Sequence, residues 1–339
     1  MALEADDGFV AHQGQTIQAV YPCGVAALSP RSRIWLALVT VWILWGTTYL
    51  AIAVVVRSMP PLLAAGARFL VAGGLMYGWS VRRGDRSGDR PTARQWRSAA
   101  IIGGALLLVS NGLIMAAERD VPSGLTALII AMVPMWVALF DRVFFGRRLP
   151  PVAIIGLVTG FGGAALLVGG QITGDTDVLA TLMVVVAALS WVVGSLFARG
   201  AELPARPLVG TGMEMLCGGV FLLVAGTLAG EWTRMRPGDF DASSWAALAY
   251  LVVFGSLIGF ASYVWLIRNA PTALASTYAY VNPVVAVLLG SLILSEPLTP
   301  RMLLAGVIII VSVALIVTSQ GRSATPQEQA ENLRVASGE

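Results

Sequence analysis

The feature that most constrains this chain is a charge-free apolar run over residues 272–294 that contains a proline and several polar side chains. A helix needs roughly 20 apolar residues to cross about 30 Å of hydrocarbon, so the run is long enough to span a membrane. Within it, Ser276-Thr-Tyr-Ala-Tyr-Val-Asn-Pro283 places a proline where the Ala279 carbonyl loses its helical hydrogen bond. A spanning helix tolerates that loss where protein, water or a ligand supplies another partner. The run therefore predicts a spanning helix that faces protein or a cavity at Pro283.

The same pattern occurs earlier in the chain. Superposing Pro134 on Pro283, an offset of 149 residues, matches further arginine, proline and leucine positions without a gap. Upstream the offset becomes 146 and matches Trp45 with Trp191. The sequence therefore predicts two related halves.

The composition is that of a multi-pass membrane protein. Hydrophobic residues make up 57% of the chain, charged residues only 12%, and the mean hydropathy is +0.78. A soluble globular chain has about 25% charged residues. We predict an all-α membrane protein with ten transmembrane helices, five in each half, near 34–56, 61–81, 98–117, 122–145, 150–170, 178–199, 206–229, 244–267, 271–294 and 300–318.

The predicted domains follow from these runs. A disordered cytoplasmic tail over 1–32 precedes a first repeat over 33–170, and a second repeat over 178–318 precedes a cytoplasmic tail over 319–339. All 22 basic residues are arginine, with 16 in the tails and loops on the N-terminal side and 5 on the other side. By the positive-inside rule both termini are cytoplasmic. Five spans per half make the second half inverted, a recurrent plan among secondary transporters.

Several function classes are disfavoured. A chain without lysine has neither a P-loop nor a Schiff-base amine. His12, the only histidine, lies in the tail, and Cys23 and Cys217 form no metal-binding pair, so we expect no metal, cofactor or enzymatic activity. The stretch Gly160-Phe-Gly-Gly-Ala-Ala165 resembles a dinucleotide fingerprint, but inside a span it favours helix packing. The arginines of the topology account for a pI near 9.1, so no nucleic-acid partner is expected.

Three ionisable residues within or beside the spans need an explanation, since a charge in the membrane costs several kcal/mol unless it is paired or wetted. Arg68 and Glu214 occupy matching repeat positions at similar depth from opposite faces. Arg68 is either a structural anchor or a functional charge, and Glu214 is either structural or linked to proton exchange. Glu118, beside Arg119 at the end of a span, is predicted to be interfacial.

Polar and aromatic residues gather in repeat-equivalent spans and could line a cavity. Tyr278 and Asn282 are four residues apart and so share a helix face beside Pro283. Tryptophan and tyrosine are also common anchors at the membrane interface, which is the alternative for each one alone. The predicted lining residues are Trp45, Thr48, Tyr49, Pro134, Trp191, Ser195, Tyr278, Tyr280, Asn282 and Pro283.

The motifs together resemble a known family. They are Trp45-Gly-Thr-Thr-Tyr49, Arg68-Phe-Leu, Asn111-Gly, Val121-Pro-Ser-Gly124, Ser190-Trp191, Glu214-Met and the run from Ser276 to Ala286. Their order is similar to that of the EamA family of the drug/metabolite transporter superfamily, nearest its YedA-like bacterial permeases. The resemblance covers about residues 34–318, adds Asn111 to the candidate binding residues, and implies a ten-helix inner-membrane carrier of two inverted repeats.

One turn departs from that family. Many EamA repeats end the fourth span with a Gly-Glu-Arg-Leu-like turn, whereas the first half here has Gly146-Arg-Arg-Leu149. The second half keeps the acid as Glu296. A symmetric gating role for Glu296 is therefore not supported.

The function expected from these features is secondary transport, most simply export of small organic metabolites, amino acids or drugs by alternating access, with proton coupling left open. The alternatives are an uncoupled facilitator or channel and a flippase for lipid-linked intermediates. The expected partners are a small-molecule substrate and the lipid bilayer, with the chain a monomer or a homodimer.

The arginine asymmetry makes a topological prediction. A fluorescent protein fused to the C-terminus should fluoresce, and alkaline phosphatase fused there should be inactive, because both would lie in the cytoplasm. Active phosphatase at the C-terminus would contradict the predicted orientation.

Overall fold

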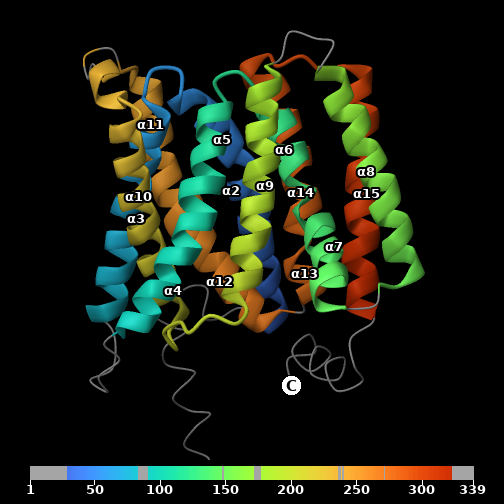
Figure 1. Ribbon diagram of the computed structural model, residues 1–339, viewed down its shortest axis with the longest axis horizontal. Coiled ribbons are helices and arrows are strands. Elements are labelled where there is room, and N and C mark those ends of the chain that lie inside the picture. Colours follow the sequence, from blue (N-terminus) through green and yellow to red (C-terminus); the bar gives the residue numbers. More distant parts are fainter. Residues whose placement is uncertain are drawn as a thin grey trace, which may run out of the picture.

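The computed structural model describes residues 29–82, 91–146, 149–171, 177–235, 238, 240–270 and 272–322, and these form helices and short connections with no strand. Figure 1 shows the helices standing side by side in one bundle. Most of the two predicted tails, 1–32 and 319–339, lies outside the described residues, as do Arg147 and Arg148. The all-helical fold class is confirmed.

The first half contributes five helical segments, two of them interrupted. They are α2 (Pro30–Val55), α3 (Pro61–Arg82), α4 (Ala93–Gly103) continued by the π-helix η1 (Gly104–Asn111) and α5 (Gly112–Ala117), α6 (Ser123–Ile130) followed by α7 (Val133–Phe145), and α8 (Pro151–Gln171). The helices begin where the sequence indicates, with Pro30 and Pro61 as first residues and a Thr92–Gln95 capping box before α4.

The second half repeats this order. It comprises α9 (Val178–Ala198), α10 (Pro207–Leu228), α11 (Ala242–Tyr250) continued by the π-helix η4 (Leu251–Ile258) and α12 (Gly259–Asn269), α13 (Thr272–Ala275) followed by α14 (Tyr278–Leu294), and α15 (Pro300–Arg322). A short 3-10 helix, η2 (Glu231–Arg234), lies between α10 and α11. In both halves the third segment contains a π-helix and the fourth is interrupted.

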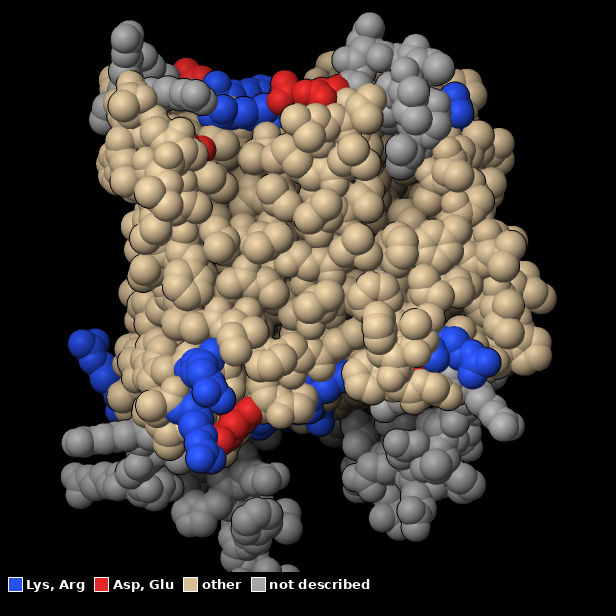
Figure 2. Space-filling model, in the orientation of Figure 1, with Lys and Arg blue, Asp and Glu red and all other residues tan. Residues whose placement is uncertain are grey.

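Eight of these segments are long and apolar enough to cross a membrane. Within the described residues, the other two predicted spans contain shorter apolar helices, Pro151–Leu167 and Tyr278–Leu294. Large apolar side chains point outward, including Phe144, Leu228 and Leu292 at 70%, 83% and 78% exposure. Figure 2 shows the uncharged belt that results, with charged side chains gathered at its two ends. Such a surface suits hydrocarbon, so the chain is a multi-pass membrane protein.

Equivalent helices of the two halves pack against each other in opposite directions. Gly66 of α3 faces Leu223 of α10, and further along α3, Gly73 faces Met215. The helices α8 and α15 behave in the same way, since Gly156 faces Ser312 and Ile316, whereas Gly163, further along α8, faces Ile308. Antiparallel packing of matching helices is what an inverted repeat requires.

Two glutamates of the second half hold the starts of α3 and α6 in the first half, and both helices start at the end of the bundle that is uppermost in Figure 1. Glu231 accepts hydrogen bonds from the Leu62 and Leu63 amides at 3.2 and 2.9 Å, at the start of α3. Glu296 accepts from the Ser123 and Gly124 amides at 2.9 and 3.1 Å, at the start of α6. Each carboxylate satisfies amides that have no partner within their own helix, and it lies at the positive end of the helix dipole.

The α3–α10 contact makes a prediction about two adjacent glycines. A Cβ on Gly73 would lie 2.8 Å from the Met215 Cβ and 2.9 Å from the Leu216 amide nitrogen, whereas a Cβ on Gly74 meets nothing within 4 Å. Gly73→Ala should therefore destabilise the protein by about 1–3 kcal/mol through overpacking. Gly74→Ala should stabilise it by about 0.5–1 kcal/mol through helix propensity. Thermal unfolding in detergent measures both, and equal effects would contradict the close approach.

Candidate functional site

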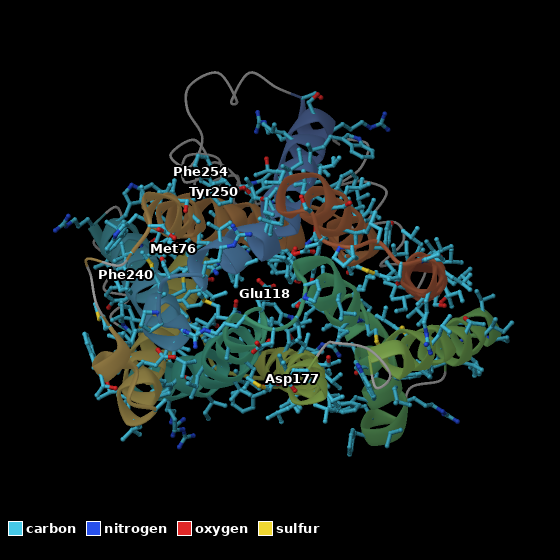
Figure 3. All side chains as sticks on the ribbon, turned by 90° about the horizontal axis from the view of Figure 1, so that it is seen from above. Met76, Glu118, Asp177, Phe240, Tyr250 and Phe254 are labelled. Atoms are coloured by element: carbon cyan, nitrogen blue, oxygen red, sulfur yellow. The ribbon has the colours of Figure 1, made fainter. Side chains whose placement is uncertain are left out.

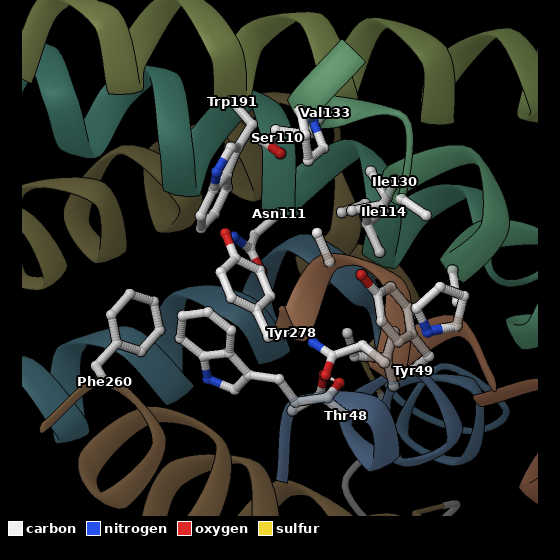
Figure 4. Close-up of a pocket in the computed structure, with 18 of the residues that line it drawn as sticks. Thr48, Tyr49, Ser110, Asn111, Ile114, Ile130, Val133, Trp191, Phe260 and Tyr278 are labelled. Carbon is white, nitrogen blue, oxygen red and sulfur yellow. Dashed lines mark hydrogen bonds between the residues drawn. The ribbon is translucent and has the colours of Figure 1, made fainter. Parts of the chain in front are cut away.

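A cavity of about 100 Å³ lies between the two halves, bordered by α2, α3, η1, α5, α6, α7, α9, α12 and α14. Figure 4 shows its side chains converging from these helices. It brings together most of the residues predicted from sequence, namely Trp45, Thr48, Tyr49, Arg68, Asn111, Pro134, Trp191, Tyr278, Asn282 and Pro283. Both halves contribute to one site.

Aromatic side chains form one wall of the cavity around Trp45. Its ring lies 5.2 Å from that of Tyr278, 5.3 Å from Phe260 and 4.9 Å from Tyr263, measured between centroids. The Trp45 indole N–H donates to the Gly255 carbonyl at 3.3 Å. These contacts fix the indole, and edge-to-face aromatic pairs of this kind each add about 0.5–1.5 kcal/mol beyond the area they bury. The wall is therefore a preformed apolar surface.

The two π-helices place polar groups at the cavity. Asn111, the last residue of η1, donates through Nδ2 to the Leu106 carbonyl at 2.9 Å, and the neighbouring Ser110 hydroxyl is buried without a partner in the described residues. In η4, Ser256 accepts a hydrogen bond from Arg68 Nε at 2.9 Å. Single π turns inside α-helices occur frequently at functional sites. Here they occupy matching places on the two halves.

The two repeat-related prolines are not equivalent in the structure. Pro134 is the second residue of α7, which follows a turn at Ala131 and Met132 that interrupts the helix after α6. Pro283 lies inside α14, so the helix continues past it while the Ala279 carbonyl lacks its usual donor. In the first half the helix is therefore interrupted directly before the turn that contains Pro134. In the second half it is interrupted earlier, at residues 276–277, and Pro283 lies within the helix that follows.

Asn282 is engaged by backbone rather than free for a ligand. With its amide nitrogen directed toward α2, it donates to the Trp42 carbonyl at 3.1 Å and to the Tyr278 carbonyl at 3.2 Å. These bonds tie α14 to α2 beside the irregular stretch at Pro283, so the side chain has a structural role whether or not it also contacts a ligand.

Four predicted residues lie outside the cavity lining: Ser195, Tyr280, Glu118 and Glu214. Tyr280 packs against the apolar core beside α6, α7 and α15. Glu214 is half-buried on α10, where the backbone of α4 approaches it at Gly103.

Conversely, the sequence analysis did not identify Ser110, Phe260 or Ser256. Ser110 could have been found as the neighbour of Asn111, but no local signal marks a π-helix.

Glu118 lies beside a second cavity, of about 430 Å³, at the end of the bundle where Glu296 caps α6. It was predicted to be interfacial, but its side chain is only 5% exposed and neither carboxylate oxygen has a partner in the described residues. Burial, and secondly the nearby charge of Glu296, raises the pKa of Glu118 well above its ordinary value. Figure 3 looks along the bundle and shows Glu118 lying among the surrounding helices. Burial therefore favours the protonated form of this carboxyl group over the carboxylate.

This fold and this central cavity define a class of membrane protein built from two inverted halves. The family model described as the EamA-like transporter family matches residues 32–169 and again 178–318. The chain therefore belongs to the EamA-like transporter family.

Individual relatives agree with this assignment. The chain is 39% identical to the uncharacterized inner membrane transporter YedA of Escherichia coli strain K12, over 83% of this chain and 89% of that protein. It is 25% identical to the uncharacterized transporter YvbV of Bacillus subtilis strain 168, over 87% and 94%. A protein of known crystal structure, 22% identical, shares the fold with a TM-score of 0.58 over 87% of this chain and 100% of its own.

The unequal prolines make a prediction. Pro283→Ala should supply the missing donor to the Ala279 carbonyl, which stabilises α14 by about 1 kcal/mol and slows turnover by stiffening it. Pro134→Ala is the matched control and should change stability little, because the first turn of a helix needs no such bond. Thermal unfolding in detergent compares the two variants. A Pro283→Ala protein no more stable than the parent would contradict this account.

Proposed function

We propose that this membrane transporter is a secondary carrier that moves small organic molecules across the cytoplasmic membrane by alternating access, most simply as an exporter. The observation that carries the proposal is the cavity between the two inverted halves, bordered by α6 and α7 on both sides of their interruption and by the first residues of α14, which follows the interruption in the second half. Discontinuous helices beside a mid-membrane cavity are where secondary transporters bind their cargo.

In this proposal the protein has ten membrane helices, five per half. They are the eight long apolar segments and the two shorter apolar helices of α8 and α14. The domain limits are those predicted from sequence. Both termini are cytoplasmic, which places Glu231 and Glu296 on the outer side. Their helix caps join the two halves there, and this supports closure of the outer side in this conformation. Opening toward the outside would require these caps to separate.

Glu118 is the better candidate for proton coupling, and Glu214 the alternative. Glu118 is buried, lacks a partner in the described residues, and lies within electrostatic reach of both Glu296 and Tyr49, which lines the central cavity. The other charged groups around this second cavity are Arg57, Arg119 and Asp120. Loss of the proton would place a second negative charge beside the Glu296 cap, which weakens the closed arrangement. Protonation would favour it.

Proteoliposomes test the function and the coupling together. A cargo is first identified by growth of an overexpressing strain on a panel of toxic amino acids and drugs. Purified protein should then accelerate counterflow of that cargo and use a pH gradient to accumulate it. Absence of counterflow would reject the carrier function. A cargo flux that does not saturate with cargo concentration would indicate a channel. Scrambling of labelled lipid without cargo counterflow would indicate a flippase.

The coupling prediction concerns Glu118→Gln, which mimics the protonated carboxyl group. It should abolish accumulation driven by the pH gradient and leave counterflow measurable, whereas Glu214→Gln should retain both. Gradient-driven accumulation by Glu118→Gln at the parent level would remove Glu118 from the coupling mechanism.

Stability provides an independent check of the same group. Because the folded state binds this proton more tightly than the unfolded state, stability should fall as the pH rises above the ordinary pKa of a glutamate. Glu118→Gln should lose that part of the pH dependence in thermal unfolding.

A further inference from the structure

We propose that the central cavity selects organic anions, with Arg68 as the counter-charge for a carboxylate on the cargo. This inference rests on the transporter proposed above and adds the chemical class of its substrate.

Arg68 is a cation held inside the protein with part of its hydrogen-bonding capacity unused. Its side chain is 3% exposed and lines the cavity. Nε donates to the Ser256 hydroxyl, and the guanidinium carbon lies 4.7 Å from the centre of the Phe69 ring. Nη1 is buried and has no partner in the described residues. The guanidinium is therefore oriented from one side and has a donor left unoccupied.

No protein anion balances this charge within the described residues. In the part of the chain that the structure describes, no carboxylate lies within 4 Å of the Arg68 nitrogens, and no acidic residue is among those lining the cavity. Glu214, its repeat-related partner, lies on α10 outside the cavity, and Glu118 borders the second cavity instead. An unpaired charge at membrane depth costs several kcal/mol unless it is paired or wetted. A carboxylate from outside would supply the missing charge and accept from Nη1.

The rest of the cavity indicates what accompanies that carboxylate. Trp45, Phe260 and Tyr278 form the aromatic wall, and Trp191 adds a further aromatic side chain from α9. The Ser110 hydroxyl is the other buried polar group without a partner among the lining residues. Figure 4 shows Ser110, Trp191 and Tyr278 around the same space. The ligand class is therefore a small carboxylate with an apolar or aromatic body.

A matched pair of probes separates this role from a purely structural arginine. The carboxylate 3-phenylpropionate and the neutral amide 3-phenylpropionamide have nearly the same shape and differ in charge. Purified protein should bind the carboxylate at least about tenfold more tightly, equivalent to about 1.4 kcal/mol. Isothermal titration in detergent measures both affinities. A structural arginine with hydrated donors would give no preference for the charged probe.

Three variants assign the preference to this residue. Arg68→Gln should reduce the carboxylate-to-amide ratio to about one, and Arg68→Lys should keep part of it, since the charge remains but the planar fork is lost. Arg142→Gln removes an exposed arginine on α7, outside the cavity, and should leave the ratio unchanged. If Arg68→Gln does not fold, the carboxylate-to-amide affinity ratio of the parent protein is compared with that of Arg68→Lys. A lower ratio in Arg68→Lys assigns the preference to Arg68.

The outcomes distinguish this inference from the proposed function. Equal affinity for the two probes, preference for the amide, or no binding of the carboxylate overturns the anion site. Counterflow of other cargo in the same preparation would show that transport itself stands. Arg68-dependent carboxylate binding without counterflow of any cargo would support the anion site and contradict the carrier.

Discussion

Every backbone amide and carbonyl inside hydrocarbon needs a hydrogen-bond partner, and in this protein irregular backbone from both halves lies beside the central cavity or supports its lining. The π-helix η1 ends at the cavity, and the α6/α7 break contributes Ala131 and Val133 to its lining. In the second half, η4 supplies the Gly255 carbonyl and Ser256 hydroxyl that hold Trp45 and Arg68. The π-helices of both halves and the α6/α7 break thus either line the candidate binding site or hold side chains that line it.

The two halves are alike in packing and unlike in charge. Glycines allow α3 and α10 to approach closely along an antiparallel contact, and glycines of α8 do the same for α15, which brings matching helices of the two halves together. The polar groups do not repeat: Arg68 corresponds to Glu214, and the position that matches Glu296 is Arg147. The two halves can therefore surround the cavity with similarly arranged helices, while the only charged residue among the described residues that line it is the cation Arg68.

Most of the residues that the sequence singled out line the cavity, and the exceptions have physical reasons. Tyr280 is two residues from Tyr278, and about 100° of rotation per helical residue turns it to another face, toward the core beside α15. Glu118 follows the last residue of α5, so its position along the chain indicated an interface. Its burial instead comes from the neighbouring helices, and the nearby Glu296 belongs to the other half.

The sequence by itself determined the membrane class, the helical segments, the duplication and the family, because hydropathy and repeat matching depend on residues close in the chain or at a constant offset. Only the tertiary structure decided which polar groups meet. Arg68 and Ser256 are 188 residues apart, and Glu296 reaches an amide 173 residues away. Such contacts depend on how each helix is rotated about its axis. Close glycine packing and the π turns set that rotation, and neither is visible in the pattern of apolar residues.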